Sequence, residues 1–227
     1  MGAAQRSFMP EHNYYVPGMQ AAADLGQMTH GRVSLGAPVI ADADGILSGQ
    51  SIAAAVDTVS FAATYAPTEA IMGKFGRALT VVASGAATSN VTVYGRDYLG
   101  QKMRESFTLN GNTPVAGKKA FRYIDRVTAG VTAATTINVG WGDALGLPYV
   151  TMKVEEEFVD NVAGAAGSLA APVFTDPQTA TTGDPRGMYD PTAALNGVKI
   201  IEVDCEFSNF VNAAGNGGMH GIRHFNG

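Results

Sequence analysis

The feature that most constrains the fold of this chain is an alternation of apolar and polar residues with a period of two. Residues 198–210 read VKIIEVDCEFSNF, and the apolar positions of the alternation are Ile201, Val203, Cys205 and Phe207. A β-strand with one buried face and one wet face produces this period, whereas the period of an α-helix is 3.6 residues. The segment therefore predicts an amphipathic strand with an acidic outer face.

The same period occurs on both sides of a short, charged connection. Residues 90–96 and 102–109 flank the four residues Asp97 to Gly100. A connection of this length is commonly a type I turn closed by a residue with positive φ, which glycine adopts without steric cost. We therefore expect a β-hairpin, with the charged side chains of the stretch on its solvent-facing side.

Glu105 breaks this pattern, because it shares its parity with apolar Met103 and Phe107. An unpaired carboxylate in the interior of a protein would be very costly. We expect Glu105 either to lie at the margin of the sheet or to pair with a cation such as Arg122.

Further strand-like segments follow at short spacing, and no helical pattern exceeds ten residues. The additional expected strands cover residues 33–40, 45–52, 56–63, 77–83, 120–130, 135–142 and 146–158. A hairpin turn is expected around Asp42–Gly45, and a loop at Pro114 and Gly117. Glycine is abundant, with 28 in 227 residues, and charged residues are only 15%, against roughly 25% in typical domains. The predicted fold is mainly β, an antiparallel β-sandwich or barrel with a jelly-roll-like arrangement.

The irregular segments define the expected domain organisation. Residues 1–31 are expected to form an extended N-terminal arm, and residues 32–210 the β domain. A proline-rich stretch at 163–196 predicts a long loop that is functional or lies against a neighbour. Residues 211–227 form a glycine-rich C-terminal tail.

Composition argues against several classes of partner. The net charge is −5 and the 15 basic residues are scattered, so the basic patch of a nucleic-acid-binding protein is missing. The single cysteine rules out an internal disulfide framework. No apolar run approaches the roughly 20 residues of a membrane span, and the start of the chain lacks a secretory signal pattern. We expect a soluble protein that is made in the cytoplasm and binds neither nucleic acid nor a membrane.

Three motifs resemble binding sites, but each lacks a residue or an element that the site would need. The Asp42–Gly45 stretch resembles the start of a calcium loop, but Ala53 stands where a bidentate glutamate is required. The GNGGMHG stretch at 215–221 lacks the following helix of a dinucleotide fingerprint. His220 and His224 have the spacing of metal ligands on a helix, which the glycines around them disfavour. We therefore predict no metal site and no cofactor.

Catalytic arrangements are equally sparse. Cys205 lies on the apolar face of its strand and is expected to be a core residue. The only pair of acids that could serve a glycan hydrolase is Glu105 with Asp125. We predict no catalytic residues and no enzymatic activity, with a glycan hydrolase as the least favoured alternative.

Two stretches resemble structural proteins of tailed bacteriophages. Residues 91–127, VTVYGRDYLGQKMRESFTLNGNTPVAGKKAFRYIDRV, contain a strand, a charged D-x-x-G turn, a strand ending in LNG, and a T-x-V-x-G-K-K-A-F loop. Residues 183–203, GDPRGMYDPTAALNGVKIIEV, are similar to the C-terminal part of the same proteins. The resemblance is to capsid decoration proteins, also called cement or head-stabilising proteins, and it covers about a quarter of the chain.

This resemblance implies a role on the exterior of the capsid, after assembly in the host cytoplasm. The implied partner is the major capsid protein, whose subunits the chain would bridge and stabilise, and the implied state is a homo-oligomer, with a trimer favoured. The alternative is another virion component, such as a tail tube, fibre or baseplate protein. The residues expected to contact a partner are Phe8, Tyr14, Tyr15, Arg186, Tyr189, His220, His224 and Phe225.

Overall fold

The structure is a computed structural model that describes residues 28–52, 56–57, 61–130, 135–176, 178–208, 218–222 and 224. The described strands form three sheets in which all strand pairings are antiparallel. The sequence-based prediction of a mainly β, antiparallel fold is confirmed. The one described helix is the single turn α2 (Glu69–Met72), capped by the hydroxyl of Thr68.

The first sheet, sheet A, has the order β1-β14-β10-β11, and its strands are β1 (Met28–Gly36), β14 (Ile201–Ser208), β10 (Thr151–Val159) and β11 (Val162–Gly164). Sheet B has the order β12-β13-β9-β4-β7, with β2 also paired to β9. Its strands are β12 (Ser168–Ala170), β13 (Met188–Asp190), β9 (Thr135–Gly146), β4 (Arg77–Ala83), β7 (Val115–Phe121) and β2 (Asp42–Ile52).

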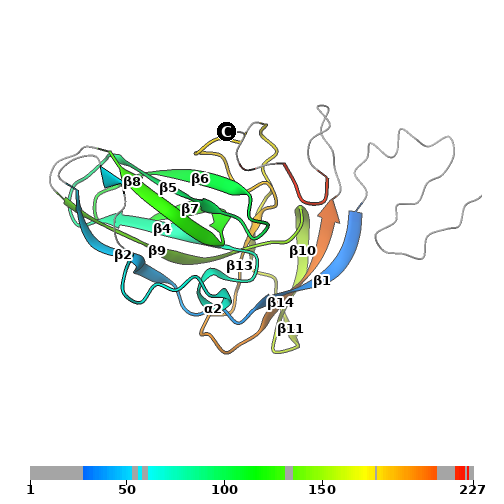
Figure 1. Cartoon of the computed structure of the whole chain (residues 1–227). Coiled ribbons are helices and arrows are strands. Elements are labelled where there is room, and N and C mark those ends of the chain that lie inside the picture. The colour runs from blue at the N-terminus through cyan, green and yellow to red at the C-terminus, as the bar shows by residue number, and fades with distance from the viewer. Residues whose placement is uncertain are drawn as a thin grey trace, which may run out of the picture.

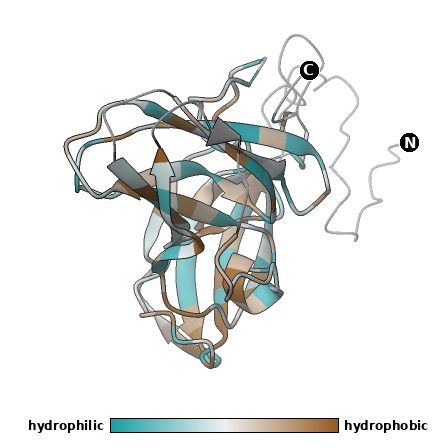
Figure 2. Ribbon diagram, turned by 60° about the vertical axis from the view of Figure 1, so that its left-hand side comes forward, coloured by the Kyte–Doolittle hydropathy of each residue, from teal (hydrophilic) through white to brown (hydrophobic). Residues whose placement is uncertain are grey.

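Sheet C has the order β3-β8-β5-β6, and its strands are β3 (Val56–Asp57), β8 (Tyr123–Ala129), β5 (Asn90–Arg96) and β6 (Lys102–Thr108). Sheets B and C curl around each other on one side of the molecule, while β1, β14 and β10 stand together on the other side (Figure 1). Apolar and polar segments alternate along several of the strands (Figure 2), as expected for sheets with one buried face.

Two large hydrophobic cores, and a small cluster of Ala78, Ala120 and Met188, are present among the described residues. The larger core lies between sheets B and C and includes Val93, Phe107 and Trp141. The smaller one lies under sheet A and includes Val203 and Cys205. The long strand β9 serves both, because Trp141 belongs to the first core and Leu145, near its end, belongs to the second. The apolar face predicted for residues 201–207 is therefore the inner face of sheet A.

The hairpin predicted at residues 90–109 is confirmed. Strands β5 and β6 pair from Asn90 with Thr108 to Arg96 with Lys102, without a register shift. Gly100 closes the connection with φ of 79°, as expected for a residue in the left-handed region. The expectation that the charged residues are solvent-facing is wrong for Asp97, whose side chain is fully buried.

The hairpin turn predicted around Asp42–Gly45 is wrong. These four residues lie within β2, which pairs with β9, while β1 pairs with β14 on a different sheet. The glycine is required here by packing, because a Cβ at Gly45 would lie 2.3 Å from Cη2 of Trp141. The Asp-x-Asp-Gly sequence, which resembles a turn, therefore gives room to a large ring of the neighbouring strand.

The loop predicted at Pro114 and Gly117 does not extend to Gly117: Pro114 precedes the strand, but Val115–Phe121 form β7 at the edge of sheet B. Gly117 is again needed for close approach, since a Cβ there would lie 3.0 Å from the backbone oxygen of Leu79 and from Glu105 Oε2. A glycine inside a strand marks such a contact as well as it marks a turn.

The stretch at 163–196 lies largely against the same chain. It contains the end of β11 and the short strands β12 and β13, and β13 continues sheet B by pairing with β9. The expected arm overlaps with the sheet, because residues 28–31 belong to β1, and residues 1–27 lie outside the described part. Of the expected tail, residues 218–222 and 224 are described, and they also contact the body of the same chain.

Candidate functional site

The residues predicted to contact a partner are distributed unevenly. Phe8, Tyr14, Tyr15 and Phe225 lie outside the described residues. His220 is exposed. The remaining three are buried within this chain: Arg186 is 1% exposed, and Tyr189 and His224 are fully buried. Their side chains are used inside the protomer, so we do not retain them as surface contacts.

Asp97, the first residue of the β5–β6 connection, is the starting point of a buried polar network. Its Oδ1 accepts hydrogen bonds from the backbone N–H groups of Leu99 and Gln101, at 2.9 and 2.8 Å. Its Oδ2 accepts a hydrogen bond from Nη2 of Arg186 at 2.8 Å. One oxygen thus shapes the turn, and the other binds a residue 89 positions later in the sequence.

Arg186 is the centre of the network. Its Nη1 donates to the backbone oxygen of His220 at 3.3 Å, and its Nη2 lies 2.9 Å from Nε2 of His224. The guanidinium carbon lies 5.0 Å from the centre of the Tyr98 ring, a cation–π contact. A buried guanidinium is stable only when its donors are used, and here two segments of the chain, the β5–β6 connection and residues 218–224, supply the acceptors.

His224 is held in its neutral form by this arrangement. A guanidinium can only donate, so Nε2 of His224 must be the acceptor and the ring proton must be on Nδ1, which has no hydrogen-bond partner among the described residues. Burial lowers the pKa of His224 from 6.5 to about 4, and Arg186 acts in the same direction. The carboxylates of Asp97 and Asp184, 3.6 and 3.9 Å from Nε2, oppose this shift.

Asp184 joins the network to sheet B. Its Oδ2 accepts the backbone N–H of Ala120 in β7 at 3.1 Å, and its Oδ1 accepts the N–H of Arg186 at 2.9 Å. Its own N–H donates to the oxygen of Lys118, and its oxygen accepts from Val173. The Gly-Asp-Pro-Arg sequence is thus fixed against β7 by both its side chains and its backbone.

Glu105 lies in the interior beside this network, at 3% exposed. Its Oε1 accepts the N–H of Lys118 at 2.5 Å, and its Oε2 has no partner in the described structure. Burial raises the pKa of Glu105 to about 7, although the nearby Lys119 lowers it in part. The expected pair with Arg122 is wrong, because Nη1 of Arg122 donates to the oxygen of Pro67.

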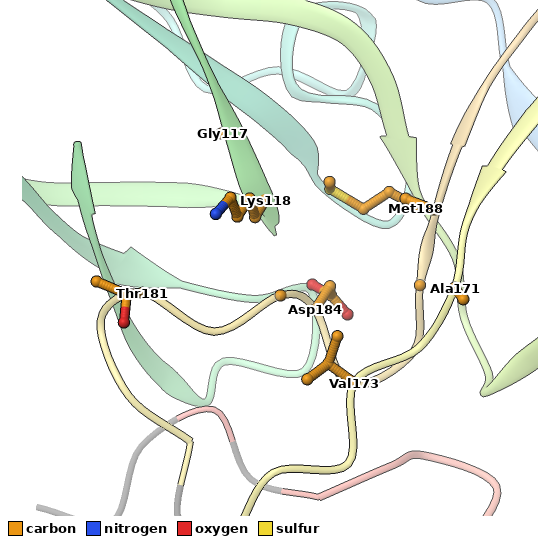
Figure 3. Close-up of a pocket in the computed structure, with 10 residues that line it drawn as sticks. Gly117, Lys118, Ala171, Val173, Thr181, Asp184 and Met188 are labelled. Atoms are coloured by element: carbon orange, nitrogen blue, oxygen red, sulfur yellow. The ribbon is translucent and has the colours of Figure 1, made fainter. Parts of the chain in front are cut away.

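A cavity of about 390 Å³ adjoins the network. Its walls are mainly small or apolar, including Ala171, Val173 and Met188, and Asp184 is its buried acid (Figure 3). Both oxygens of that carboxylate already accept backbone N–H groups. The acid therefore serves to hold the surrounding loops, and no other acid is among the described residues that line the cavity.

Another buried carboxylate, that of Glu157, binds residues 189–193 of the 163–196 stretch. Glu157 of β10 accepts hydrogen bonds from the hydroxyl of Tyr189 and the N–H of Thr192 on Oε2, and from the N–H of Ala193 on Oε1, at 2.6, 2.9 and 3.0 Å. Burial and the bond to Glu157 raise the pKa of Tyr189. Tyr189 is thus a structural anchor of this stretch.

The acid pair considered for a hydrolase is not brought together. Glu105 is buried, whereas Asp125 is exposed and pairs with Arg96 at 3.1 Å, on the outer side of sheet C. Cys205 is 1% exposed, and burial raises its pKa to about 12, so the thiol is protonated at neutral pH. Within the described ranges, no three His, Cys, Asp or Glu side chains are grouped so that they could hold a metal ion.

The sequence pattern predicted some of these residues and not others. Glu105 shares its parity with apolar Met103 and Phe107, which indicated an unusual position for a carboxylate. Asp97 and Asp184 were missed, because Asp in D-x-x-G and in Gly-Asp-Pro is typical of exposed turns. Their local sequence, D-x-x-G and Gly-Asp-Pro, contains no signal that separates a buried acid from an exposed turn residue.

The part of the chain that the structure describes contains no helix with the length and apolarity needed to cross a bilayer. Comparison of the chain with protein-family models, with curated proteins and with solved structures found no match.

Proposed function

We propose that this chain is a structural protein of a tailed-bacteriophage virion that binds the exterior of the capsid and stabilises it by bridging subunits of the major capsid protein. In this role it acts without catalysis, as a symmetric oligomer for which the resemblance favours a trimer. The proposal begins from the resemblance of residues 91–127 and 183–203 to capsid decoration proteins.

The observation that carries the proposal is the meeting of these two stretches in space. Asp97 belongs to the first stretch and Arg186 to the second, and they form the buried ion pair at 2.8 Å. Asp184, also of the second stretch, binds Ala120 of the first at 3.1 Å. The residues that carry the resemblance therefore fix one shared framework, which is the arrangement expected if both stretches belong to one family fold.

The use of the polar residues also supports a structural role. The buried carboxylates of Asp97, Asp184 and Glu157 accept hydrogen bonds from backbone and side-chain donors in distant segments. A protein that stiffens a shell must itself be rigid, and a lattice of copies adds many weak contacts through multivalency. Buried carboxylates that accept hydrogen bonds from distant segments hold these segments in fixed positions and so make the protein rigid.

The experiment is an add-back assay on capsids stripped of this protein. Purified wild-type chain is added to stripped heads, and the temperature at which the shells release their DNA is measured. We expect the release temperature to rise as the chain saturates the heads. Equal release temperatures with and without bound chain would rule out the stabilising role.

Exposed aliphatic side chains offer variants that should leave the fold intact. Ile40 and Val198 are 70% and 77% exposed, and their segments are joined by the hydrogen bond from Gly197 to Pro38. Ile40→Asp and Val198→Asp are tested for binding to stripped heads, with Leu99→Asp, at the distant β5–β6 connection, as the matched control. Gold labelling of intact virions separates the capsid from the tail, fibre or baseplate as the location.

A further inference from the structure

The outer face of sheet C brings together basic side chains that are scattered along the sequence. Strand β5 pairs with β6 on one side and with β8 on the other, and directly opposite residues share a face. Two rows across these strands lie on the side opposite the core, and each row contains two cations and one tyrosine: Lys102, Arg96 and Tyr123 in one, and Arg104, Tyr94 and Arg126 in the next. The basic residues are therefore scattered in the sequence but clustered on this surface, because three strands supply them.

This face has a net positive charge on a protein that is acidic as a whole. Among the side chains that β5, β6 and β8 place there, Asp125 is the one acid, and it pairs with Arg96 at 3.1 Å. Four cations and one acid give the face a net charge of +3, whereas the whole chain has −5. The side chains of Arg96 and Asp125 are 51% and 43% exposed, so the charges are open to solvent. Figure 1 shows β5, β6 and β8 far from β1 and β14, which form the acidic side of sheet A.

The cations of this face repel one another in the free protein. Arg96 lies directly opposite Lys102, and like charges at directly opposite positions of an antiparallel pair are destabilising. In the next row, the guanidinium of Arg126 lies 4.2 Å from the centre of the Tyr94 ring, a cation–π contact that keeps it on the face. A partner with negative charge would neutralise both rows and remove the repulsion.

The arrangement suits the carboxylates of a folded protein better than a strand of nucleic acid. Guanidinium groups bind carboxylates and phosphates alike, so the cations alone do not decide between them. Single-stranded nucleic acids bind such sheets by stacking bases on aromatic rings. Here a guanidinium already lies over each ring, Arg126 over Tyr94 and Arg122 over Tyr123 at 5.0 Å. Asp125 also repels a continuous chain of phosphates, whereas a protein surface of mixed charge can place a cation beside it.

We propose that the outer face of sheet C is a docking surface for a carboxylate-rich surface of another protein. The inference deepens the proposed function and rests on it in one respect, since on the virion that acidic surface would belong to the major capsid protein. Recognition of carboxylates is a property of the chain in solution, and it is testable without the virion.

The test measures binding of the full-length chain to a fluorescent poly-L-glutamate peptide by anisotropy at low ionic strength, where charge screening is weak. The test variant, Arg96→Gln with Lys102→Gln, removes two positive charges from the face. The matched control, Arg32→Gln with Lys153→Gln, removes two positive charges from sheet A, where these side chains are 42% and 58% exposed. Both variants have the same net charge, so a difference between them reports the location of the binding site.

We expect the test variant to bind the peptide at least about tenfold more weakly than the wild type, and the control to differ from it by less than about twofold. Absence of binding by the wild type, or an equal loss in both variants, would overturn the proposal. Because Arg96 and Lys102 repel each other, the test variant should unfold in urea at a midpoint no lower than that of the wild type, which separates lost binding from lost folding.

A second variant changes the face in the opposite direction. Asp125→Asn removes the one acid and should tighten binding of the peptide, whereas unchanged or weaker binding contradicts the proposal. Single-stranded DNA of the same charge is the competing ligand. If it binds more tightly than the peptide and loses binding in the Arg96→Gln, Lys102→Gln variant, the face recognises nucleic acid and the proposal is wrong.

Stripped heads separate this inference from the proposed function. If the Arg96→Gln, Lys102→Gln variant binds heads as well as the wild type does, the docking face is wrong and the capsid role stands. If the wild type binds the peptide through this face but does not bind heads, the capsid role fails and the recognition of carboxylates stands.

Discussion

Because Glu105 is buried, the free energy of unfolding of this protein should fall as the pH rises. The substitution Glu105→Gln should abolish this part of the pH dependence. The pKa of Glu105 is raised from 4.5 to about 7 by burial. The folded chain therefore binds a proton between these values that the unfolded chain releases. By proton linkage, the stabilisation from protonated Glu105 is complete below pH 4.5 and is lost as the pH rises through 7. At about 1.4 kcal/mol per pH unit, the total loss is about 3 kcal/mol.

Glu105→Gln keeps the shape of the neutral acid and cannot ionise. We expect the variant and the wild type to have similar free energies of unfolding at pH 4.5, and the variant to be more stable by about 3 kcal/mol at pH 8. Urea unfolding, followed by the fluorescence of the single Trp141, measures both at several pH values. A difference that does not change with pH would refute the reasoning.

Glu157→Gln is the matched control, because it makes the same substitution at another buried carboxylate. Glu157 accepts hydrogen bonds from three donors, one of them the hydroxyl of Tyr189. An amide nitrogen cannot accept, so this variant should be less stable than the wild type by about 1–3 kcal/mol at pH 7. Stabilisation by both substitutions would indicate a general effect of removing negative charge and would contradict the specific role of Glu105.

Three further outcomes are expected. The pKa of His224 is lowered to about 4, so its contribution is present above pH 6.5 and is lost as the pH falls to 4; His224→Gln should remove a loss of about 3 kcal/mol over that range in urea titrations. Asp97→Asn leaves Arg186 without its buried counter-charge and should lower the free energy of unfolding by about 3–5 kcal/mol. Adding Arg186→Met to this variant should recover part of the loss. Fully additive effects of the two substitutions would show that the two side chains do not stabilise each other. Gly45→Ala places a methyl group against Trp141 and should cost about 1–3 kcal/mol by thermal unfolding, whereas Gly85→Ala, 3.4 Å from its nearest neighbour, should be near neutral.

Local periodicity predicted the strands well where each one has one wet face. The alternation in residues 201–208 and the hairpin at 90–108 follow directly from side-chain parity, since a β-strand with one face in solvent buries every second residue. The period of two therefore predicted the fold class, and it also identified Glu105 as an interior carboxylate or a marginal one.

Long-range packing could not be predicted in the same way. Gly45 and Gly117 have the sequence signature of turns, yet each makes room for a group on another strand, Trp141 in one case and Leu79 with Glu105 in the other. Asp97 has the signature of an exposed turn residue, and its burial depends on an arginine 89 positions later. A single sequence contains the turn propensity but not the identity of the distant partner.

The Asp97–Arg186–His224 network has a consequence for the order of events during synthesis. Asp97 emerges from the ribosome long before Arg186, which neutralises it, and His224, which completes the cluster, follows later still. Until then, burial of the turn after β5 would desolvate the unpaired carboxylate of Asp97, which is unfavourable. Sheets B and C should consequently remain loosely associated on the nascent polypeptide, and consolidation of the domain should be a late step that follows the synthesis of Arg186 and His224.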